Sequence, residues 1–105
     1  MIITTTNSIE GKDISRYLGI VTENMYVSLY NTKGLSFKES LSMRKAYQNG
    51  EENIEQSKKE IFAKLEEKAK ALGANAIVGV SMDVEMIFEA STLGISVMGT
   101  AVFYT

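Results

Sequence analysis

Residues 69–85 read AKALGANAIVGVSMDVE, and this stretch decides the fold because a helical pattern ends within it and a strand pattern begins. We expect Gly73 to end the helix, since glycine adopts the left-handed conformation at a helix C-terminus without a steric penalty from Cβ. After Asn75 the pattern alternates with the period of two that is typical of a strand with one buried face. The residues expected on one face are Val78, Val80, Met82, Val84 and Met86, and those on the other are Gly79, Ser81, Asp83 and Glu85.

Two helices are predicted ahead of this strand. Apolar residues at spacings of three, four and seven mark one face of a long helix that ends at Gly73. That core face comprises Ile54, Ile61, Phe62, Leu65, Ala69 and Leu72. A shorter helix is expected to begin at Ser36–Glu39, which has the S-x-x-E pattern of a capping box, and a break at Gln48–Gly50 separates the two.

Three further strands are predicted, at Ile2–Thr5, Ile14–Tyr30 and Ile95–Tyr104. The long strand from Ile14 is apolar on both faces, which indicates cover on both sides or a contact between subunits. Its expected faces are Leu18, Ile20 and Thr22 on one side and Tyr17, Gly19 and Val21 on the other. The last strand is expected to pair with the strand after Asn75 as an antiparallel hairpin.

Two glycines fall inside predicted strands, at Gly79 and Gly99. Because glycine weakens a strand interior, each is expected to mark a bulge or the close approach of another segment, with packing favoured over a ligand. The element order predicts one α+β domain over residues 1–105, an antiparallel sheet with helices on one face.

Composition excludes several classes of site. The 105 residues contain no cysteine and no histidine, so disulfides, thiolate metal sites, cysteine nucleophiles and imidazole bases are absent. No nucleophile-plus-base pair or nucleotide-binding loop is found, so we expect no enzyme and no cofactor. The net charge of −2 gives no reason to expect nucleic acid. The N-terminus lacks the pattern of a signal peptide and no segment is long and apolar enough to span a membrane, so cytoplasmic localisation is expected.

Four motifs, in order along nearly the whole chain, resemble the YbjQ-like family of small bacterial proteins. They are the I-E-G of Ile9–Gly11, the G-I-V-T of Gly19–Thr22, the ALGANAIVGV of Ala71–Val80 and the G-T-A-V of Gly99–Val102. The resemblance implies a two-layer β-α-β-β subunit of the dodecin-subunit-like kind, and assembly into a ring-shaped homopentamer.

The family is often labelled as heavy-metal-binding, which this chain matches poorly. Soft metals prefer thiolate, thioether or imidazole ligands, and here only methionine thioethers remain. Family members commonly carry a segment resembling G-R-S-G-x-Y-E before the long helix, whereas residues 45–55 read KAYQNGEENIE. Asn49–Glu51 keep the turn and the acid, but the arginine and the later glycine and tyrosine are missing.

Asp83 and Glu85 are the candidate metal ligands. They lie two residues apart on a strand, so both carboxylates project from one face, where Glu89 could join them to hold a hard cation such as Ca²⁺ or Mg²⁺. The alternative, an exposed polar strand face, is favoured. The sequence gives even less support for a role of the two carboxyl groups as general acid and general base.

Three other groups of residues have an interpretation as core, turn or interface. The methionines at positions that pattern as apolar, Met25, Met43, Met82, Met86 and Met98, are expected to fill the core rather than bind copper(I). The hydroxyl and cationic group Thr4, Thr5, Thr6, Ser8, Lys12 and Arg16 could contact phosphate or form an edge strand and turn. The tyrosines are expected to be interface anchors rather than residues of the bulk core, and they are Tyr17, Tyr26, Tyr30 and Tyr47.

The sequence therefore predicts a self-assembling homopentameric scaffold or small-ligand binding module with no catalytic site. The alternative is a metal-ion binding protein that uses carboxylates such as Asp83 and Glu85.

Overall fold

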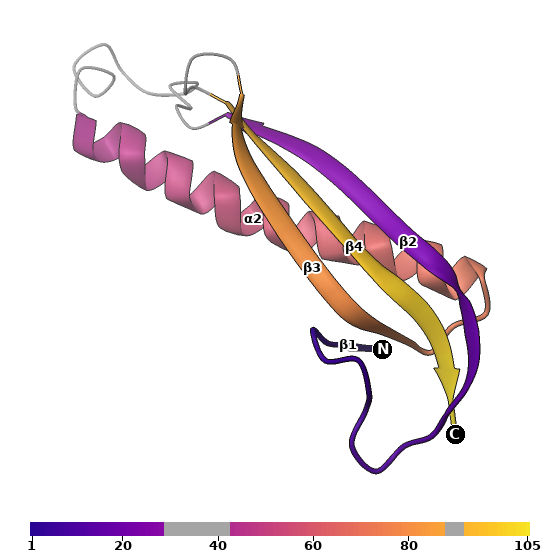
Figure 1. The fold of residues 1–105 in the computed structure, drawn as a ribbon. Helices are drawn as coiled ribbons and strands as arrows, with labels where there is room; N and C mark the ends of the chain where they lie inside the picture. Colours follow the sequence, from indigo (N-terminus) through magenta and orange to yellow (C-terminus); the bar gives the residue numbers. More distant parts are fainter. Residues whose placement is uncertain (29–42, 88–91) are drawn as a thin grey trace.

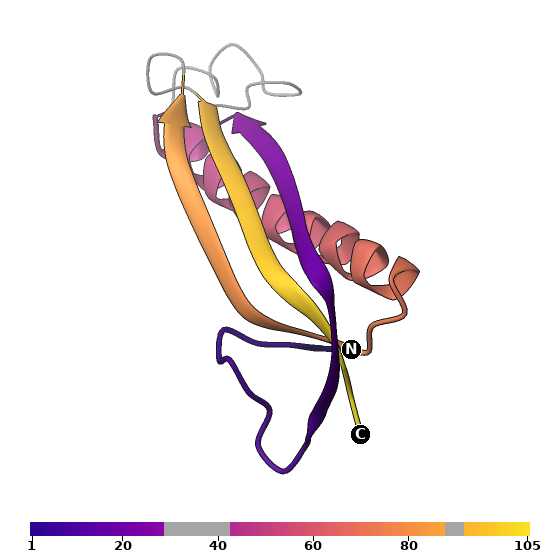
Figure 2. The same ribbon diagram turned by 45° about the vertical axis from the view of Figure 1, so that its right-hand side comes forward.

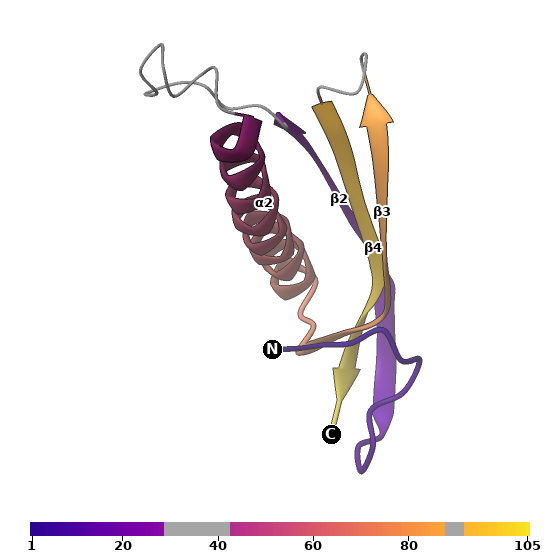
Figure 3. The ribbon, with the colours of Figure 1, turned by 90° about the vertical axis from the view of Figure 1, so that its left-hand side faces the viewer.

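The computed structural model describes residues 1–28, 43–87 and 92–105, with the side chains of Ser28, Ile87 and residues 43–53 outside the description. Its elements are β1 (Ile2–Ile3), β2 (Ile14–Ser28), α2 (Met43–Ala71), β3 (Ala76–Ile87) and β4 (Thr92–Tyr104). The strands form one sheet and α2 covers one of its faces, so the chain folds into two layers (Figures 1 and 3).

The sheet is mixed, in the order β1-β3-β4-β2. The predicted hairpin is confirmed, because β3 pairs antiparallel with β4, and β4 pairs antiparallel with β2. The prediction of a purely antiparallel sheet is wrong, because Ile2 and Ile3 pair in parallel with the start of β3. Antiparallel pairing on both sides of β4 makes β2 and β3 run in the same direction.

The C-terminus of α2 is capped as predicted. Gly73 has a φ of +87°. The backbone N–H of Ala74 donates to the carbonyl of Ala69 at 3.1 Å, and that of Gly73 donates to Lys70 at 2.9 Å. This pair of bonds is a Schellman motif, which satisfies carbonyls at the helix end and turns the chain into β3.

The N-terminal half of α2 differs from the prediction. The helix runs without interruption from Met43 through Asn49 and Gly50, so the predicted break is wrong. An interior glycine costs about 1 kcal/mol relative to alanine, which is too little to end a long helix by itself. The predicted capping box at Ser36–Glu39 lies outside the described residues.

The main core lies between α2 and the sheet. The predicted core residues Ile61, Leu65 and Ala69 are fully buried, with Ile54 and Phe62 partly buried beside them. They pack against sheet residues that include Val21, Ile77, Val80, Ile95, Val97 and Ala101. Leu72 was also predicted in this core, but it follows the last helical residue and is exposed.

A β-bulge at Gly79 changes the predicted faces of β3. Its φ is +61°, and between Val78 and Ser81 the strand gains one residue relative to β4. Val78 therefore packs in a second cluster, away from α2, whereas Val80 packs toward α2. The predicted bulge is confirmed, and the predicted common face of Val78 and Val80 is wrong.

The helix-free side of the sheet has its own small core at one end. It contains Ala76, Val78 and Val102, covered by Ile9, Ile14 and Tyr104. The N-terminal segment thus closes this end of the sheet.

Irregularities in β2 account for a second error in the predicted faces. Register shifts occur between Ile14 and Arg16 and between Tyr17 and Gly19, where φ is +131°. Leu18 and Val21 consequently both pack in the main core, although they were expected on opposite faces.

No helix in the described part of the chain is long and apolar enough to cross a membrane.

Candidate functional site on the helix-free face

Polar side chains cover the middle of the sheet on the side away from α2, and we call this surface the open face. Cross-strand pairing sets its residues in three rows. The rows are Thr22–Met98–Ser81, Asn24–Ser96–Asp83 and Tyr26–Gly94–Glu85. The rows place hydroxyl, amide and carboxylate groups from three strands next to one another.

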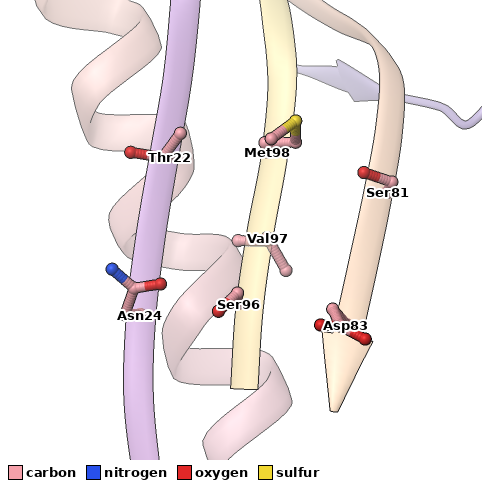
Figure 4. Close-up of a pocket in the computed structure, with 7 residues that line it drawn as sticks. All are labelled: Thr22, Asn24, Ser81, Asp83, Ser96, Val97 and Met98. Atoms are coloured by element: carbon pink, nitrogen blue, oxygen red, sulfur yellow. The ribbon is translucent and has the colours of Figure 1, made fainter. Parts of the chain in front are cut away.

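The open face has a hollow of about 350 Å³ at its centre. Thr22 and Asn24 line it from β2, Ser81 and Asp83 from β3, and Ser96, Val97 and Met98 from β4 (Figure 4). A second hollow of about 210 Å³ lies beside it and includes Asn24, Tyr26 and Glu85. The hydroxyl, amide and carboxylate groups of the lining can accept hydrogen bonds, and its hydroxyl and amide groups can also donate them.

The two predicted metal ligands lie where the strand pattern placed them. Asp83 and Glu85 are exposed on the same face of β3, one in each hollow. Glu89, the third carboxylate of the prediction, lies outside the described residues. Among the side chains described in residues 1–28, 54–87 and 92–105, no three acidic, histidine or cysteine groups are close enough to hold a metal ion. Two carboxylates fall short of the six to eight oxygen ligands that Ca²⁺ takes.

The described methionines are divided between the two sides of the sheet. Met82 and Met86 pair with the buried residues Val97 and Leu93, so they lie on the helix side of the sheet. Met98 lies on the open face. Met25 and Met82 are partly buried against the core as predicted, whereas Met86 and Met98 are exposed, contrary to the prediction.

The hydroxyl side chains near the N-terminus form hydrogen bonds within a turn, which favours the turn interpretation over a phosphate site. Thr4 Oγ1 and Thr6 Oγ1 share a hydrogen bond of 2.9 Å, and Thr6 Oγ1 donates to the Ser8 carbonyl at 2.6 Å. The Lys12 ammonium lies 5.8 Å from the centre of the Tyr104 ring. These contacts hold the groups of a turn together without a ligand.

The outer edge of β2 is reached by a lysine of α2, which the sequence did not predict. Lys68 Nζ donates to the Thr22 carbonyl at 2.8 Å and forms an ion pair with Glu23 Oε2 at 3.0 Å. The hydrogen bond from Lys68 is the largest of the effects that hold the pKa of Glu23 below its usual value. Desolvation opposes it, and the Asn24 backbone N–H and the charges of Lys68 and Lys64 add smaller lowering effects. No pattern along the chain indicated this contact, because Glu23 and Lys68 lie far apart in the sequence.

In the comparisons with known proteins, the similarity extends over all or nearly all of the chain. A family model described as "Putative heavy-metal-binding" matches residues 1–105. UPF0145 proteins from two Synechococcus strains, JA-3-3Ab and JA-2-3B'a(2-13), are 38% and 36% identical, with 97% of each chain covered. A crystal structure of a DUF74-family protein of unknown function from Pediococcus pentosaceus is similar in fold, with a TM-score of 0.63 at 19% identity. The likeness covers 100% of this chain and 98% of that one.

Proposed function

The chain belongs to the YbjQ-like (UPF0145) family, and from this premise we propose that it is a non-enzymatic protein that assembles with copies of itself into a ring. The ring is a homopentamer of dodecin-like subunits, as the family resemblance implies. It acts in the cytoplasm as a scaffold or as a binding module for a small ligand.

The observation that carries this proposal is that the sheet has two open edges in the part of the chain that the structure describes. Among the described residues, β2 pairs along Ile14–Ser28 with β4 alone. On the other side of the sheet, the N-terminal segment reaches β3 only as far as Val80, so within residues 1–28, 43–87 and 92–105 the segment Ser81–Ile87 pairs with β4 alone. An open strand edge presents unpaired N–H and C=O groups, which favour the addition of another strand.

The two edges differ, which favours a ring. Pairing of the β2 edge of one copy with the β3 edge of the next is a head-to-tail contact, and repetition of such a contact closes a ring when the rotation permits. Because β2 and β3 run in the same direction, the strands at each such seam are parallel. A closed ring has more space on its outer side than on its inner side. The bulky helix layer therefore lies outside, and the open face lines the central channel.

Two exposed tyrosines support a role in contacts between copies. Tyr17 and Tyr26 on β2 are 72% and 71% exposed in the single chain. Tyrosine is common in protein interfaces because its broad ring packs while its hydroxyl stays hydrated. The other two predicted anchors are not tested here, since Tyr30 lies outside the described residues and the side chain of Tyr47 is not described.

Light scattering of the purified protein tests the assembly. We expect a mass of five times the 11.6 kDa subunit, held constant over at least a tenfold range of concentration. A mass equal to one subunit over that range would overturn the proposal.

Metal-ion binding is the alternative function. Its support is that Asp83 and Glu85 line adjacent hollows of one face, which a ring would repeat around its channel. A bound metal raises the melting temperature in proportion to the logarithm of its concentration above the dissociation constant. The test is thermal melting with Ca²⁺, Mg²⁺, Zn²⁺ and Cu⁺.

The double variant Asp83→Asn/Glu85→Gln should then lose the rise in melting temperature. The matched control Glu55→Gln/Glu67→Gln removes two exposed carboxylates from α2 and should keep it. An unchanged melting temperature with every metal, or an equal loss in both double variants, would exclude Asp83 and Glu85 as ligands.

A further inference from the structure

Two apolar side chains of β3 lie bare beside the main core. Val84 and Met86 are 44% and 55% exposed. They pair with Ile95 and Leu93, which are buried on the helix side of the sheet. Their neighbours along the same face, Val80 and Met82, are at least partly buried. The core of the single chain therefore stops short of the outer half of β3.

The position of α2 explains this gap. The helix contacts β2 more extensively than β4 or β3, and in Figure 2 it passes behind the sheet and emerges beyond β2. Lys68 confirms the overhang, because it reaches the backbone of Thr22 and the carboxylate of Glu23 from the helix. Lys64 acts on the same carboxylate through its charge. One side of α2 thus extends over the open β2 edge, whereas the described side chains leave Val84 and Met86 of β3 exposed.

We propose that in the assembled protein the overhanging side of α2 from one copy covers Val84 and Met86 of the next copy. This inference rests on the proposed pairing of β2 with β3. If β2 of one copy joins β3 of the next in a continuous sheet, the overhanging helix and the bare apolar pair lie on the same side of that sheet. Each helix then completes the core of two subunits.

The chemistry of the two surfaces is complementary. The overhanging side of α2 carries Lys64 and Lys68, whose long aliphatic stems can pack on apolar side chains while the ammonium groups stay hydrated. Val84 and Met86 carry no charge, and the carboxylates of Asp83 and Glu85 project from the other side of the same strand, on the open face. The proposed contact is therefore apolar, with the lysine stems of α2 packed on the two side chains.

Cysteine crosslinking tests the contact directly, because the chain has no cysteine of its own. The test variant combines Lys64→Cys with Met86→Cys. The matched control combines Lys64→Cys with Met98→Cys, since Met98 is as exposed as Met86 (51% against 55%) but lies on the open face. A short bis-maleimide is added to the assembled protein, whose mass is checked by light scattering before the reaction.

We expect a ladder of covalent multimers from the test variant, at least tenfold stronger than from the control. Equal ladders, or no ladder from an assembly of normal mass, would overturn the helix contact while leaving the ring in place. A protein of single-subunit mass would overturn both proposals.

Single lysine substitutions provide a second measurement. Met86→Lys places a charge against the lysines of the neighbouring helix, so it should raise the fraction of dissociated subunit at least tenfold at equal concentration. The control Ala63→Lys adds the same charge at an exposed position of α2 and should leave that fraction unchanged. Met86 and Ala63 are both exposed in the single chain, so both variants should fold. Equal dissociation of the two variants would also overturn the contact.

Discussion

The side chain of Asn75 forms a two-way amide pair with the backbone of Tyr104. Its Nδ2 donates to the Tyr104 carbonyl at 3.0 Å, and the Tyr104 N–H donates to its Oδ1 at 2.9 Å. The backbone N–H of Asn75 also donates to the carbonyl of Val102 at 3.0 Å. A single asparagine therefore acts as one more strand partner for β4 at the point where the chain leaves the helix.

Replacement of Asn75 by aspartate tests this pairing. Asn75→Asp keeps the acceptor but removes the donor to the Tyr104 carbonyl and places a carboxylate against it. We expect a loss of about 1–3 kcal/mol in the free energy of unfolding, the usual cost of leaving a partly buried polar group unpaired. The control Asn24→Asp, at an exposed position, should change it by less than about 0.5 kcal/mol. Equal effects in chemical denaturation would contradict the role of Asn75.

Gly99 is required for close packing between β3 and β4. A Cβ at this position would lie 2.6 Å from Ile77 Cγ2 and 2.9 Å from Val80 Cγ2, both in the main core. Gly99→Ala should therefore cost about 1–3 kcal/mol, the range for overpacking a well-filled core. Ser96→Thr adds one carbon to the same strand at an exposed position and serves as the control. A stability of Gly99→Ala within error of the parent protein would show that the core has room here.

Replacement of Gly73 by a residue with a side chain should also lower stability, but for a different reason. Nothing lies within 4 Å of a Cβ built on it, but its φ of +87° is unfavourable for residues with a side chain. Gly73→Ala should cost about 1 kcal/mol from backbone strain. Gly73→Asn should cost less, because asparagine tolerates the left-handed region better. If alanine were tolerated better than asparagine in thermal melting, the strain argument would be wrong.

The Lys68–Glu23 ion pair makes the free energy of unfolding depend on pH in the acidic range. Because the folded protein lowers the pKa of Glu23, the contribution of the pair is present above the ordinary pKa of 4.5 and is lost as the pH falls through the lower folded value. In Lys68→Gln the pKa of Glu23 should rise toward the ordinary value. Carbon-13 NMR of the Glu23 carboxyl measures this directly.

The control for that titration is Lys70→Gln, which removes a lysine whose partner is Glu66, at 3.7 Å. It should leave the pKa of Glu23 unchanged. Equal shifts of the Glu23 pKa in the two variants would mean that Lys68 has no special role at the β2 edge.

The sequence allowed prediction of those features that depend on neighbours along the chain. The capping role of Gly73, the alternation that places Asp83 and Glu85 on one face, and the bulge at Gly79 all follow from local backbone chemistry. The errors in the predicted strand faces arise where one irregularity changes the register of all the residues that follow it in the strand. A single inserted residue reverses which face the following side chains occupy, so the irregularity near Gly19 was enough to misplace Ile20 and Thr22 relative to Leu18.

The open edges and the uncovered pair on β3 could not be predicted in this way. They depend on where α2 lies across the sheet, and that position is set by packing between residues far apart in the chain. The periodicity around Val84 and Met86 indicates only that they share a face with Val80. The pattern could not distinguish cover by the chain's own helix from cover by a neighbouring copy.

Residue-level hydrogen exchange of the amides in Ser81–Ile87 tests the central claim, that the open edge of β3 pairs with another copy, most directly. In a lone sheet, alternate amides of an edge strand point to solvent and exchange fast. The account predicts that both sets of amides in this segment are protected in the native protein. Fast exchange at every second amide, under conditions where the mass of the assembly is unchanged, would contradict it.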